Sequence, residues 1–318
     1  MPPAAEIEKI ERFALVLGAG GAVGLAYHAG TLRALEKVRG IDPNRADLVI
    51  GTSAGSVIGA RLRRGTTTEQ LWDLAMAVDE PIGRTEVFPP AWRSVSEFAR
   101  RAAGSAYVYS RLALPLPRVA APQALRRRFP AGMFASDEWR RQLTQELGSE
   151  WPADPLYVCA VDLDRRRRVV FGAEGAPDVP LSRAVLASCA VPGVYPPIRE
   201  AGMTLVDGGA LSTTHLDLAA GYELVLGIVP MAFDTTTPPD VRRQLLRRIP
   251  SRWVASEARI ARAAGSEVLL IRPTGHEMAH HGRNALRPDN VAAIAAAAYD
   301  TAARLLETPR FREALDRI

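Results

Sequence analysis

Short apolar runs alternate with helix-like stretches over the first 64 residues of the chain. Phe13–Leu17 and Asp47–Ile50 are brief hydrophobic segments that end at glycines, a pattern typical of buried strands. Leu25 to Val38 spaces its apolar side chains as a helix does, and Ser56 to Arg64 predicts a second helix. Strand, helix, strand and helix in this order predict a parallel sheet with right-handed crossovers, and hence an α/β fold.

The pattern is interrupted once and then resumes. Prolines recur through residues 79–135, where they predict short helices and loops that form a cap rather than a separate domain. Beyond this segment the sequence predicts further strands and a long helix capped by Asn290. These elements are expected at Leu156–Leu163, Val169–Phe171, Thr204–Asp207, Glu223–Val229, Val268–Ile271 and Asn290–Leu306. We therefore expect one domain over residues 1–318, with a core at about 13–78 and 136–306 and a cap-like insertion at about 79–135.

The composition is that of an ordinary globular protein. With 318 residues, 47% of them hydrophobic and 24% charged, the chain can bury a full core, and wholesale disorder is excluded. Its two cysteines, Cys159 and Cys189, are too few for a disulfide framework or a four-cysteine zinc site. The first twelve residues carry three glutamates, unlike the basic start of a signal peptide, so we expect a cytoplasmic protein.

Charge adds a weak indication of an anionic partner. The formal net charge is +5 and nearly all cations are arginines. The basic clusters Arg126–Arg128 and Arg165–Arg168 are expected to lie on solvated turns or helix faces, while peripheral contact with an anionic membrane stays open. Aromatic residues make up only 6% of the chain, which gives no support to nucleic-acid binding through stacking. The sequence gives no basis for predicting an oligomer.

The sharpest chemical signal is the pentapeptide Gly51-Thr52-Ser53-Ala54-Gly55. It follows a predicted strand and opens a predicted helix, which is the context of a nucleophile elbow. Glycines allow the tight turn, and the turn presents the Ser53 hydroxyl at the carboxyl end of the strand. The dipole of the following helix favours an anion developing nearby. Ser53 is therefore the candidate nucleophile.

A second glycine-rich turn, Gly18 to Gly24, also joins a predicted strand to a helix. It could cradle the pyrophosphate of a dinucleotide, but Val23 breaks the G-x-G-x-x-G spacing and no acidic residue ends the second strand. It could instead form an oxyanion hole, with the N–H groups of Gly20 and Gly21 directed at a carbonyl oxygen near Ser53.

Asp207-Gly208-Gly209 ends another predicted strand. Parallel strands of one sheet end on the same side, so we expect Asp207 to reach Ser53 despite the long sequence separation. A catalytic triad would instead need a histidine, and His215 is the best placed of the five in the chain. His28 is expected to pack within its helix, and His276, His280 and His281 to lie in a solvated loop without a metal. Spacing alone leaves the triad and a direct Ser53–Asp207 dyad both open.

Taken together, these motifs resemble the patatin-like phospholipase family of lipid acyl hydrolases. The resemblance rests on the loop and helix at Gly18 to Gly30, the elbow at Gly51 to Gly55, Asp207-Gly208-Gly209, and the segment Ala187 to Pro197, and covers about residues 15 to 230. The chain departs from the family pattern at Ala19, where the loop usually begins with glycine, and at Val23, where it usually carries Arg or Lys.

The resemblance implies a three-layer α/β sandwich with a mainly parallel central sheet flanked by helices. It implies hydrolysis of fatty-acyl esters, of the phospholipase A or carboxylesterase type, through an acyl-Ser53 intermediate. Asp207 would be the base, Gly20 and Gly21 the oxyanion hole, and no metal or cofactor would take part. The alternatives are an esterase with a Ser–His–Asp triad through His215, and a non-catalytic nucleotide- or lipid-binding protein.

Overall fold

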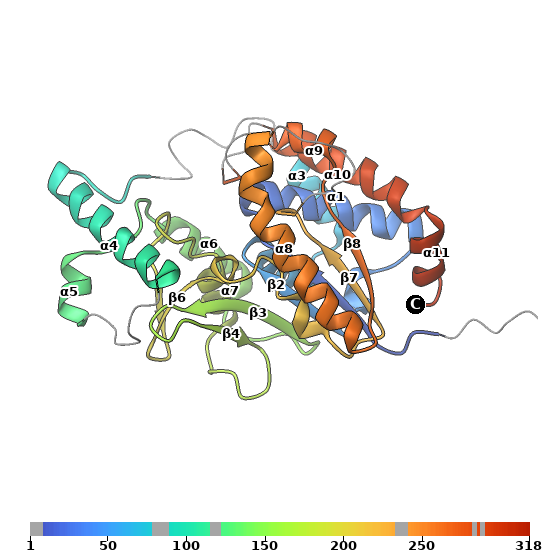
Figure 1. The fold of residues 1–318 in the computed structure, drawn as a ribbon, viewed down its shortest axis with the longest axis horizontal. Helices are drawn as coiled ribbons and strands as arrows, with labels where there is room; N and C mark the ends of the chain where they lie inside the picture. Colours follow the sequence, from blue (N-terminus) through green and yellow to red (C-terminus); the bar gives the residue numbers. More distant parts are fainter. Residues whose placement is uncertain (1–8, 78–88, 115–121, 233–240, 282–284, 287–289) are drawn as a thin grey trace, which may run out of the picture.

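The computed structural model describes residues 9–77, 89–114, 122–232, 241–281, 285–286 and 290–318. Within these residues it holds an eight-stranded sheet in the order β5-β6-β3-β2-β1-β7-β8, with β4 paired to β3 (Figure 1). The strands are β1 (Phe13–Leu17), β2 (Leu48–Thr52), β3 (Leu156–Asp162), β4 (Arg167–Phe171), β5 (Ile198–Glu200), β6 (Met203–Asp207), β7 (Leu224–Ile228) and β8 (Glu267–Ile271). The strands expected from the sequence are all present, and β5 is an addition.

Helices cover both faces of this sheet. They are α1 (Gly21–Arg39), α2 (Ala54–Arg63), α3 (Thr68–Met76), α4 (Val95–Ala113), α5 (Gln123–Arg128), α6 (Asp137–Leu147), α7 (Leu181–Ser188), α8 (Val241–Ala263), α9 (Gly275–His280), α10 (Val291–Leu306) and α11 (Pro309–Leu315). No helix in the described part of the chain is both long enough and apolar enough to cross a membrane.

The alternation of side chains along β1 shows how the three layers form. Phe13, Leu15 and Leu17 join the large core that includes the buried faces of α1, α2 and α10. Ala14 and Val16 point the other way and pack with residues of α8. Because successive strand side chains point to opposite faces, an all-apolar strand requires cover on both sides. The predicted three-layer α/β sandwich is therefore the observed architecture, and five of its strands (β3, β2, β1, β7, β8) run parallel.

Helices α1 and α10 lie so close together at Gly30 that no side chain would fit at this position. A Cβ atom on Gly30 of α1 would fall well inside the van der Waals radii of the Ala295 carbonyl of α10. The alanine-rich sequence of α10 keeps its side of this contact equally small. As the sequence predicts, Asn290 caps α10, its Oδ1 accepting from the amide of Ala293 at 2.7 Å.

The segment expected to form a cap differs from its prediction. We expected only short helices, but α4 runs for 19 residues. The prolines lie outside α4, whose first turn is capped by the Ser94 hydroxyl, which accepts from the amide of Glu97 at 3.2 Å. The positions that α4 buries, Gly104, Ser105, Val108 and Arg111, follow helical spacing with few apolar residues, which hides the periodicity. Residues 79–88 and 115–121 lie outside the described part of the chain.

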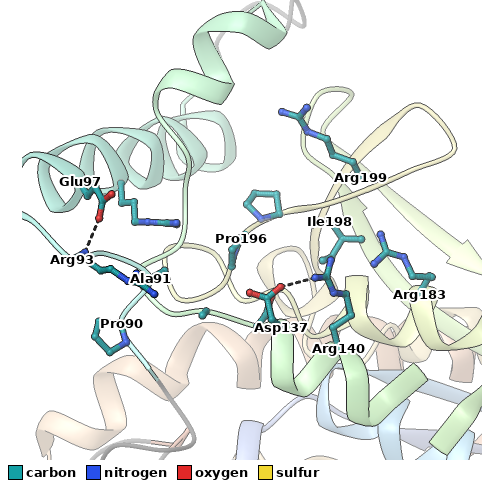
Figure 2. Close-up of a pocket in the computed structure, with 14 residues that line it drawn as sticks. Pro90, Ala91, Arg93, Glu97, Asp137, Arg140, Arg183, Pro196, Ile198 and Arg199 are labelled. Atoms are coloured by element: carbon teal, nitrogen blue, oxygen red, sulfur yellow. Dashed lines mark hydrogen bonds and ion pairs between the residues drawn. The ribbon is translucent and has the colours of Figure 1, made fainter. Parts of the chain in front are cut away.

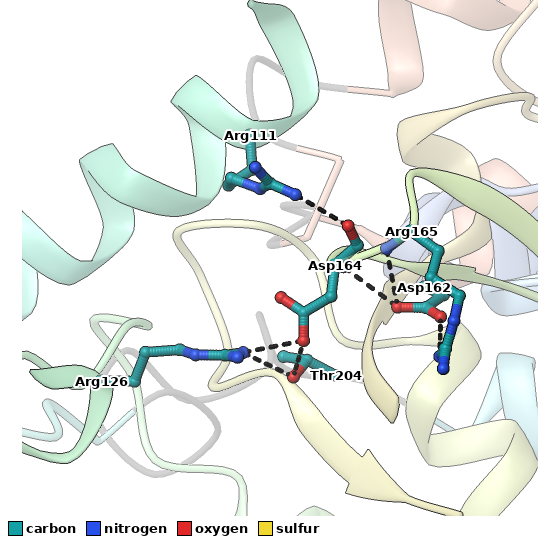
Figure 3. Close-up of polar contacts among 6 residues, drawn as sticks. All are labelled: Arg111, Arg126, Asp162, Asp164, Arg165 and Thr204. Atoms are coloured by element: carbon teal, nitrogen blue, oxygen red, sulfur yellow. Dashed lines mark hydrogen bonds and ion pairs between the residues drawn. The ribbon is translucent and has the colours of Figure 1, made fainter. Parts of the chain in front are cut away.

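Arginines attach α4 and α5 to the sheet (Figure 3). Arg111 of α4 donates to the carbonyl oxygen of Asp164 at 2.7 Å, and Arg126 of α5 donates to the Asp164 carboxylate at 3.0 Å. Thr204 of β6 donates to the same carboxylate oxygen at 2.8 Å. The prediction that the clusters beginning at Arg126 and Arg165 are solvated is thus wrong for Arg126, and for Arg168, which donates to Asp217 at 2.7 Å. Part-buried guanidinium groups bind carboxylates through several donors, so these side chains join elements rather than face water.

Gly30→Ala tests the close approach of α1 and α10. The added methyl would meet backbone atoms of Ala295, which cannot rotate away. We expect Gly30→Ala to lower the free energy of unfolding by about 1–3 kcal/mol or more in chemical denaturation. Gly59→Ala in α2 is the matched control, because the nearest atoms to its methyl are side-chain methyl groups of Val49, Leu156 and Leu17, which can shift, and not backbone atoms. Equal unfolding midpoints for the two variants would contradict the close helix contact.

Candidate active site

Two strands of opposite direction end against the middle strand β3. β2 runs parallel to β3, and its last residue, Thr52, lies opposite Cys159. β6 runs antiparallel to β3, and its last residue, Asp207, lies opposite Ala160. The end of β2 and the end of β6 therefore reach neighbouring positions of β3 from opposite directions.

The pairing of β4 shows that these two ends share one edge of β3. β4 pairs with Val158–Asp162, a stretch that overlaps the partners of both β2 and β6. A strand has only two edges, so β4 takes one, and β2 and β6 share the other. Gly208 confirms this placement, since a Cβ atom there would collide with the carbonyl of Cys159 and lie 3.0 Å from the Thr52 side chain.

This arrangement corrects the route by which Ser53 and Asp207 meet. We expected Asp207 to end a strand parallel to β2, whereas β6 is antiparallel to β3. β6 is the second strand of a hairpin with β5, whose two turn residues, Ala201 and Gly202, both have positive φ angles, and its pairing with β3 sets its direction relative to β2. Such a two-residue turn reverses the chain at once. β6 therefore runs back from the carboxyl end of β3, and its last residue, Asp207, lies next to the end of β2 and the elbow.

Ser53 occupies the strained turn of a nucleophile elbow. Its φ angle is +53° with ψ at −120°, a conformation that a non-glycine residue rarely adopts. The flanking glycines are required by space: a Cβ on Gly51 would lie 2.5 Å from the Cα of Ser56, and one on Gly55 would collide with the carbonyl of Leu17. Helix α2 therefore starts directly against β2 and β1, and the strain at Ser53 is supported by close packing on both sides.

Asp207 is buried beside Ser53. Its Oδ1 accepts from the amide of Gly209 at 2.7 Å. Burial disfavours the charged form and raises the pKa of Asp207 from 3.8 to about 6, while the nearby Ser53 side chain and the Gly209 amide partly oppose the rise. The carboxylate is thus ionised at neutral pH but is a much stronger base than an exposed aspartate.

The segment after α7 holds the serine and the aspartate together. The Ser188 hydroxyl accepts from the amide of Ser53 at 2.9 Å and donates to the carbonyl of Cys159 at 2.6 Å. Two residues later, the carbonyl of Ala190 accepts from the amide of Asp207 at 3.0 Å. One short stretch therefore holds the ends of β2 and β6 against the middle of β3. The sequence analysis identified this stretch only by its resemblance and assigned no role to Ser188.

The glycine-rich loop stands next to the elbow with free amides. Gly18 and Ala19 donate to the carbonyls of Ile228 and Thr213, which anchors the loop at its start. Within the described residues, no acceptor is bound to the amides of Gly20 and Gly21. Gly21 has a φ angle of +59° and starts α1, so this turn places unpaired N–H groups at a helix N-terminus.

An apolar cavity of about 180 Å³ opens at Ser53. Gly21 and Ser53 both line it, whereas Gly20 and Asp207 are buried and are not part of the lining. Its other walls are mainly hydrocarbon and come from α1, α2, α6, the segment after α7 and the segment before α10: Ala22, Leu25, Ala54, Val57, Trp139, Cys189, Val191, Tyr195 and Leu286. Trp139 was not identified from the sequence, because α6 carries none of the motifs, and Tyr195 lies in the segment Ala187 to Pro197, to which no role was assigned. Val23, where the family pattern carries a cation, is buried in the core.

The histidines have other partners. Nε2 of His215 lies 3.3 Å from the carbonyl of Gly208, and Nδ1 lies 3.4 Å from a guanidinium nitrogen of Arg168. Both ring nitrogens are therefore engaged away from Ser53, and burial lowers the pKa of His215 to about 4. His28 is buried as expected, with Nε2 2.8 Å from the carbonyl of Gly18. The loop expected around His280 is partly helix α9, and His281 is buried against Tyr27 instead of solvated.

One cluster has the composition of a metal site but holds a guanidinium instead. Ligand atoms of His215, Asp217 and Glu257 all lie within 4.8 Å of one another. Arg168 donates to Asp217 there, and Glu257 accepts from the Thr214 hydroxyl at 2.7 Å and from the Leu216 amide at 2.9 Å. The cluster is thus satisfied by the protein itself and fixes the loop that follows Asp207.

Comparison with known proteins identifies relatives of the chain. The family model described as patatin-like phospholipase matches residues 15–220. Lysophospholipase nte1 of Aspergillus fumigatus is 27% identical over 228 residues, and that of Emericella nidulans is 28% identical over 229. Each match covers 70% of this chain but only 12% of the relative, so the chain spans a small part of their length.

Two solved structures are similar at low identity. VipD from Legionella pneumophila has a TM-score of 0.45 and 14% identity, with 94% of this chain and 67% of that chain covered. The ExoU–SpcU complex of Pseudomonas aeruginosa has a TM-score of 0.30 and 20% identity, with 80% and 52% covered.

Asp207→Asn tests the burial of the carboxylate. Because the folded chain binds this proton more tightly than the unfolded chain, stability is lost as pH rises from about 4 through about 6, and the whole loss is present at about pH 7.5. The neutral carboxamide of Asp207→Asn removes this loss, so the variant should be more stable there by on the order of 1–3 kcal/mol, and the gain should shrink towards pH 4. Denaturant unfolding at several pH values measures this. The control Asp73→Asn, at an exposed position of α3, should show no such dependence on pH. If Asp207→Asn were no more stable than wild type at any pH, the expected cost of burying the Asp207 carboxylate would be contradicted.

Proposed function

The chain belongs to the patatin-like phospholipase family, and from this premise we propose that it hydrolyses fatty-acyl esters of lipids through an acyl-Ser53 intermediate. The observation that carries the proposal is the meeting of two strand ends, which places the buried Asp207 beside Ser53 where Ser53 lines an apolar cavity. The named relatives are lysophospholipases, which favours a phospholipid or lysophospholipid over other esters.

In the first half of the reaction, the Ser53 hydroxyl oxygen attacks the ester carbonyl carbon. Its proton passes to the nearby carboxylate of Asp207, whose raised pKa makes it a stronger base than an exposed aspartate. The tetrahedral intermediate then expels the alcohol of the ester, which takes the proton from Asp207. The acyl group remains on Ser53, and Asp207 is a carboxylate again.

The developing oxyanion needs donors that are in place before the reaction. The unpaired amides of Gly20 and Gly21 fit this role, and the N-terminus of α2 adds its dipole beside Ser53. Preorganised amides of this kind lower the barrier because they need not reorient as charge appears. Loss of one such donor typically reduces turnover by roughly 10²–10³-fold.

In the second half, water attacks the acyl carbonyl carbon and gives its proton to Asp207. The intermediate collapses, Ser53 leaves and takes that proton back, and the fatty acid is released. The same two side chains and the same donors serve both halves. The hydrocarbon lining from Leu25, Val57 and Trp139 would hold the acyl chain while its carbonyl lies at Ser53.

Ser53→Ala and Asp207→Asn test the proposed pair. Hydrolysis of a lysophospholipid and of a short nitrophenyl ester should fall below detection in Ser53→Ala, and by about 10²–10⁴-fold in Asp207→Asn, which cannot accept the proton. A fluorophosphonate probe should label the wild-type protein but not Ser53→Ala. His215→Gln is the control for a triad; it should keep its activity if folded. Wild-type rates in either dyad variant, or full loss in a folded His215→Gln, would overturn the proposal.

The pH profile provides a second test. Only the ionised form of Asp207 can accept the serine proton, and burial raises its pKa to about 6. We expect kcat/KM for an uncharged ester to be constant above about pH 7 and to fall about tenfold per pH unit below about pH 6. If His215 were the base instead, kcat/KM would fall only near pH 4, because burial lowers the pKa of His215 to about 4. An inflection near pH 4 would therefore exclude Asp207 as the base.

A further inference from the structure

A second and larger cavity lies between α4, α6 and β5. Its volume is about 640 Å³, and five arginines line it together with only two acidic residues (Figure 2). The arginines come from separate parts of the chain and surround the opening from more than one side: Arg93, Arg101, Arg140, Arg183 and Arg199. The sequence analysis did not assign a role to any of them.

Two of these guanidinium groups have no partner within the described residues. Arg93 precedes α4 and Arg199 lies in β5; both are exposed, and neither side chain donates to any other described residue. Arg183 of α7 is paired with Glu200, and Arg101 donates to the carbonyl of Gly132 at 2.9 Å. The cavity therefore presents free donors beside others that are held in place.

The acidic residues of the cavity are already in use. Glu97 accepts from the backbone amide of Arg93 at 2.6 Å, which closes the first turn of α4, and Asp137 pairs with Arg140 at the start of α6. The pair of Asp137 and Arg140 is well exposed, so it is weak and open to exchange. With cations in excess of acids, the cavity suits an anion and does not suit a metal ion.

This cavity shares a wall with the one at Ser53. Trp139 lines the apolar cavity while its neighbour Arg140 lines the arginine cavity. In the same way Tyr195 lines the first and Pro196 the second. The linings of the two cavities therefore meet in the chain at two pairs of consecutive residues. The anion site and the ester site are thus adjacent parts of the molecule.

We propose that the arginine-lined cavity is a phosphate-binding site that holds the phosphate of a phospholipid headgroup. Arginine presents several N–H donors in a planar fork that matches phosphate oxygens, and two of the arginines that line this cavity have no side-chain partner within the described residues. The identity of the lipid rests on the proposed function, because the acyl chain is placed in the apolar cavity by that function. The phosphate site itself rests only on the arginines.

The test is direct binding to protein that cannot turn over its ligand. In a Ser53→Ala background, isothermal titration calorimetry would compare lysophosphatidate with a monoacylglycerol of the same chain length, and with glycerol 3-phosphate as the free phosphate. The variant is Arg93→Gln with Arg199→Gln. Its matched control is Arg45→Gln with Arg259→Gln, which removes the same charge at two exposed positions outside the cavity.

We expect lysophosphatidate to bind at least about tenfold more tightly than the monoacylglycerol, because hydrogen bonds between guanidinium groups and phosphate oxygens are charge-assisted and the monoacylglycerol cannot form them. The preference should disappear in Arg93→Gln/Arg199→Gln and persist in the control. Competition by glycerol 3-phosphate would show that the free phosphate suffices, and its failure to compete would assign the site to the lipid headgroup. An equal preference in the cavity variant and the control would overturn the proposal.

Two further measurements keep this result separate from folding and from the proposed catalysis. Thermal unfolding reports whether the double variant is folded, and if it is not, Arg199→Gln alone serves, because Arg199 is exposed and has no side-chain partner within the described residues. If Ser53→Ala retained full esterase activity, the proposed function would fail while the phosphate preference could still be observed. If Ser53→Ala were inactive and no preference were observed, only the phosphate site would fail.

Discussion

The site depends on two strand ends that meet against one edge of β3. β2 arrives from one direction and ends at Thr52, and β6 arrives from the other and ends at Asp207. Both ends are held by the stretch from Ser188 to Ala190, through hydrogen bonds to the amides of Ser53 and Asp207. The loop Gly18–Gly24 completes the arrangement, because it is anchored to the neighbouring strand β7 at Ile228. Ser53, Asp207 and the glycine-rich loop are therefore all held through hydrogen bonds made by their own backbone or by its neighbours in the chain.

This arrangement combines two unfavourable features in one place. Ser53 adopts a strained backbone conformation, and Asp207 is an acidic group buried away from water. Strain of this kind persists only where the surrounding packing determines it, and the close contacts of Gly51 and Gly55 provide that packing. The burial that weakens folding is also what brings the pKa of Asp207 close to neutrality. Stability and the capacity to accept a proton are thus opposed at this residue.

The polar contacts of α4 and α5 explain why the helices between residues 79 and 135 were the hardest to predict from the sequence. Sequence periodicity reports apolar positions, but α4 is fixed to the core by Arg111 and by glycine and serine contacts. Arg126 reads as a surface cation in the sequence, and it becomes part-buried only because Asp164 and Thr204 lie opposite it. Such partners are far apart in the chain, and no local pattern reveals them. The arginine-lined cavity was hidden for the same reason, since its cations come from separate elements.

By itself the sequence determined seven of the eight strands, the α/β class, the elbow at Ser53 and the glycine-rich loop, because each depends on local spacing of apolar residues and glycines. The three layers were expected from the family resemblance. It also singled out Asp207 as the acidic residue at a strand end. Only the tertiary structure decided how Asp207 reaches the rim, which side chains line the apolar cavity, and that His215 is engaged by Gly208 and Arg168. Strand direction is set by the hairpin turn and by pairing with β3, and pairing between distant segments is a property of the folded chain rather than of any short stretch of it.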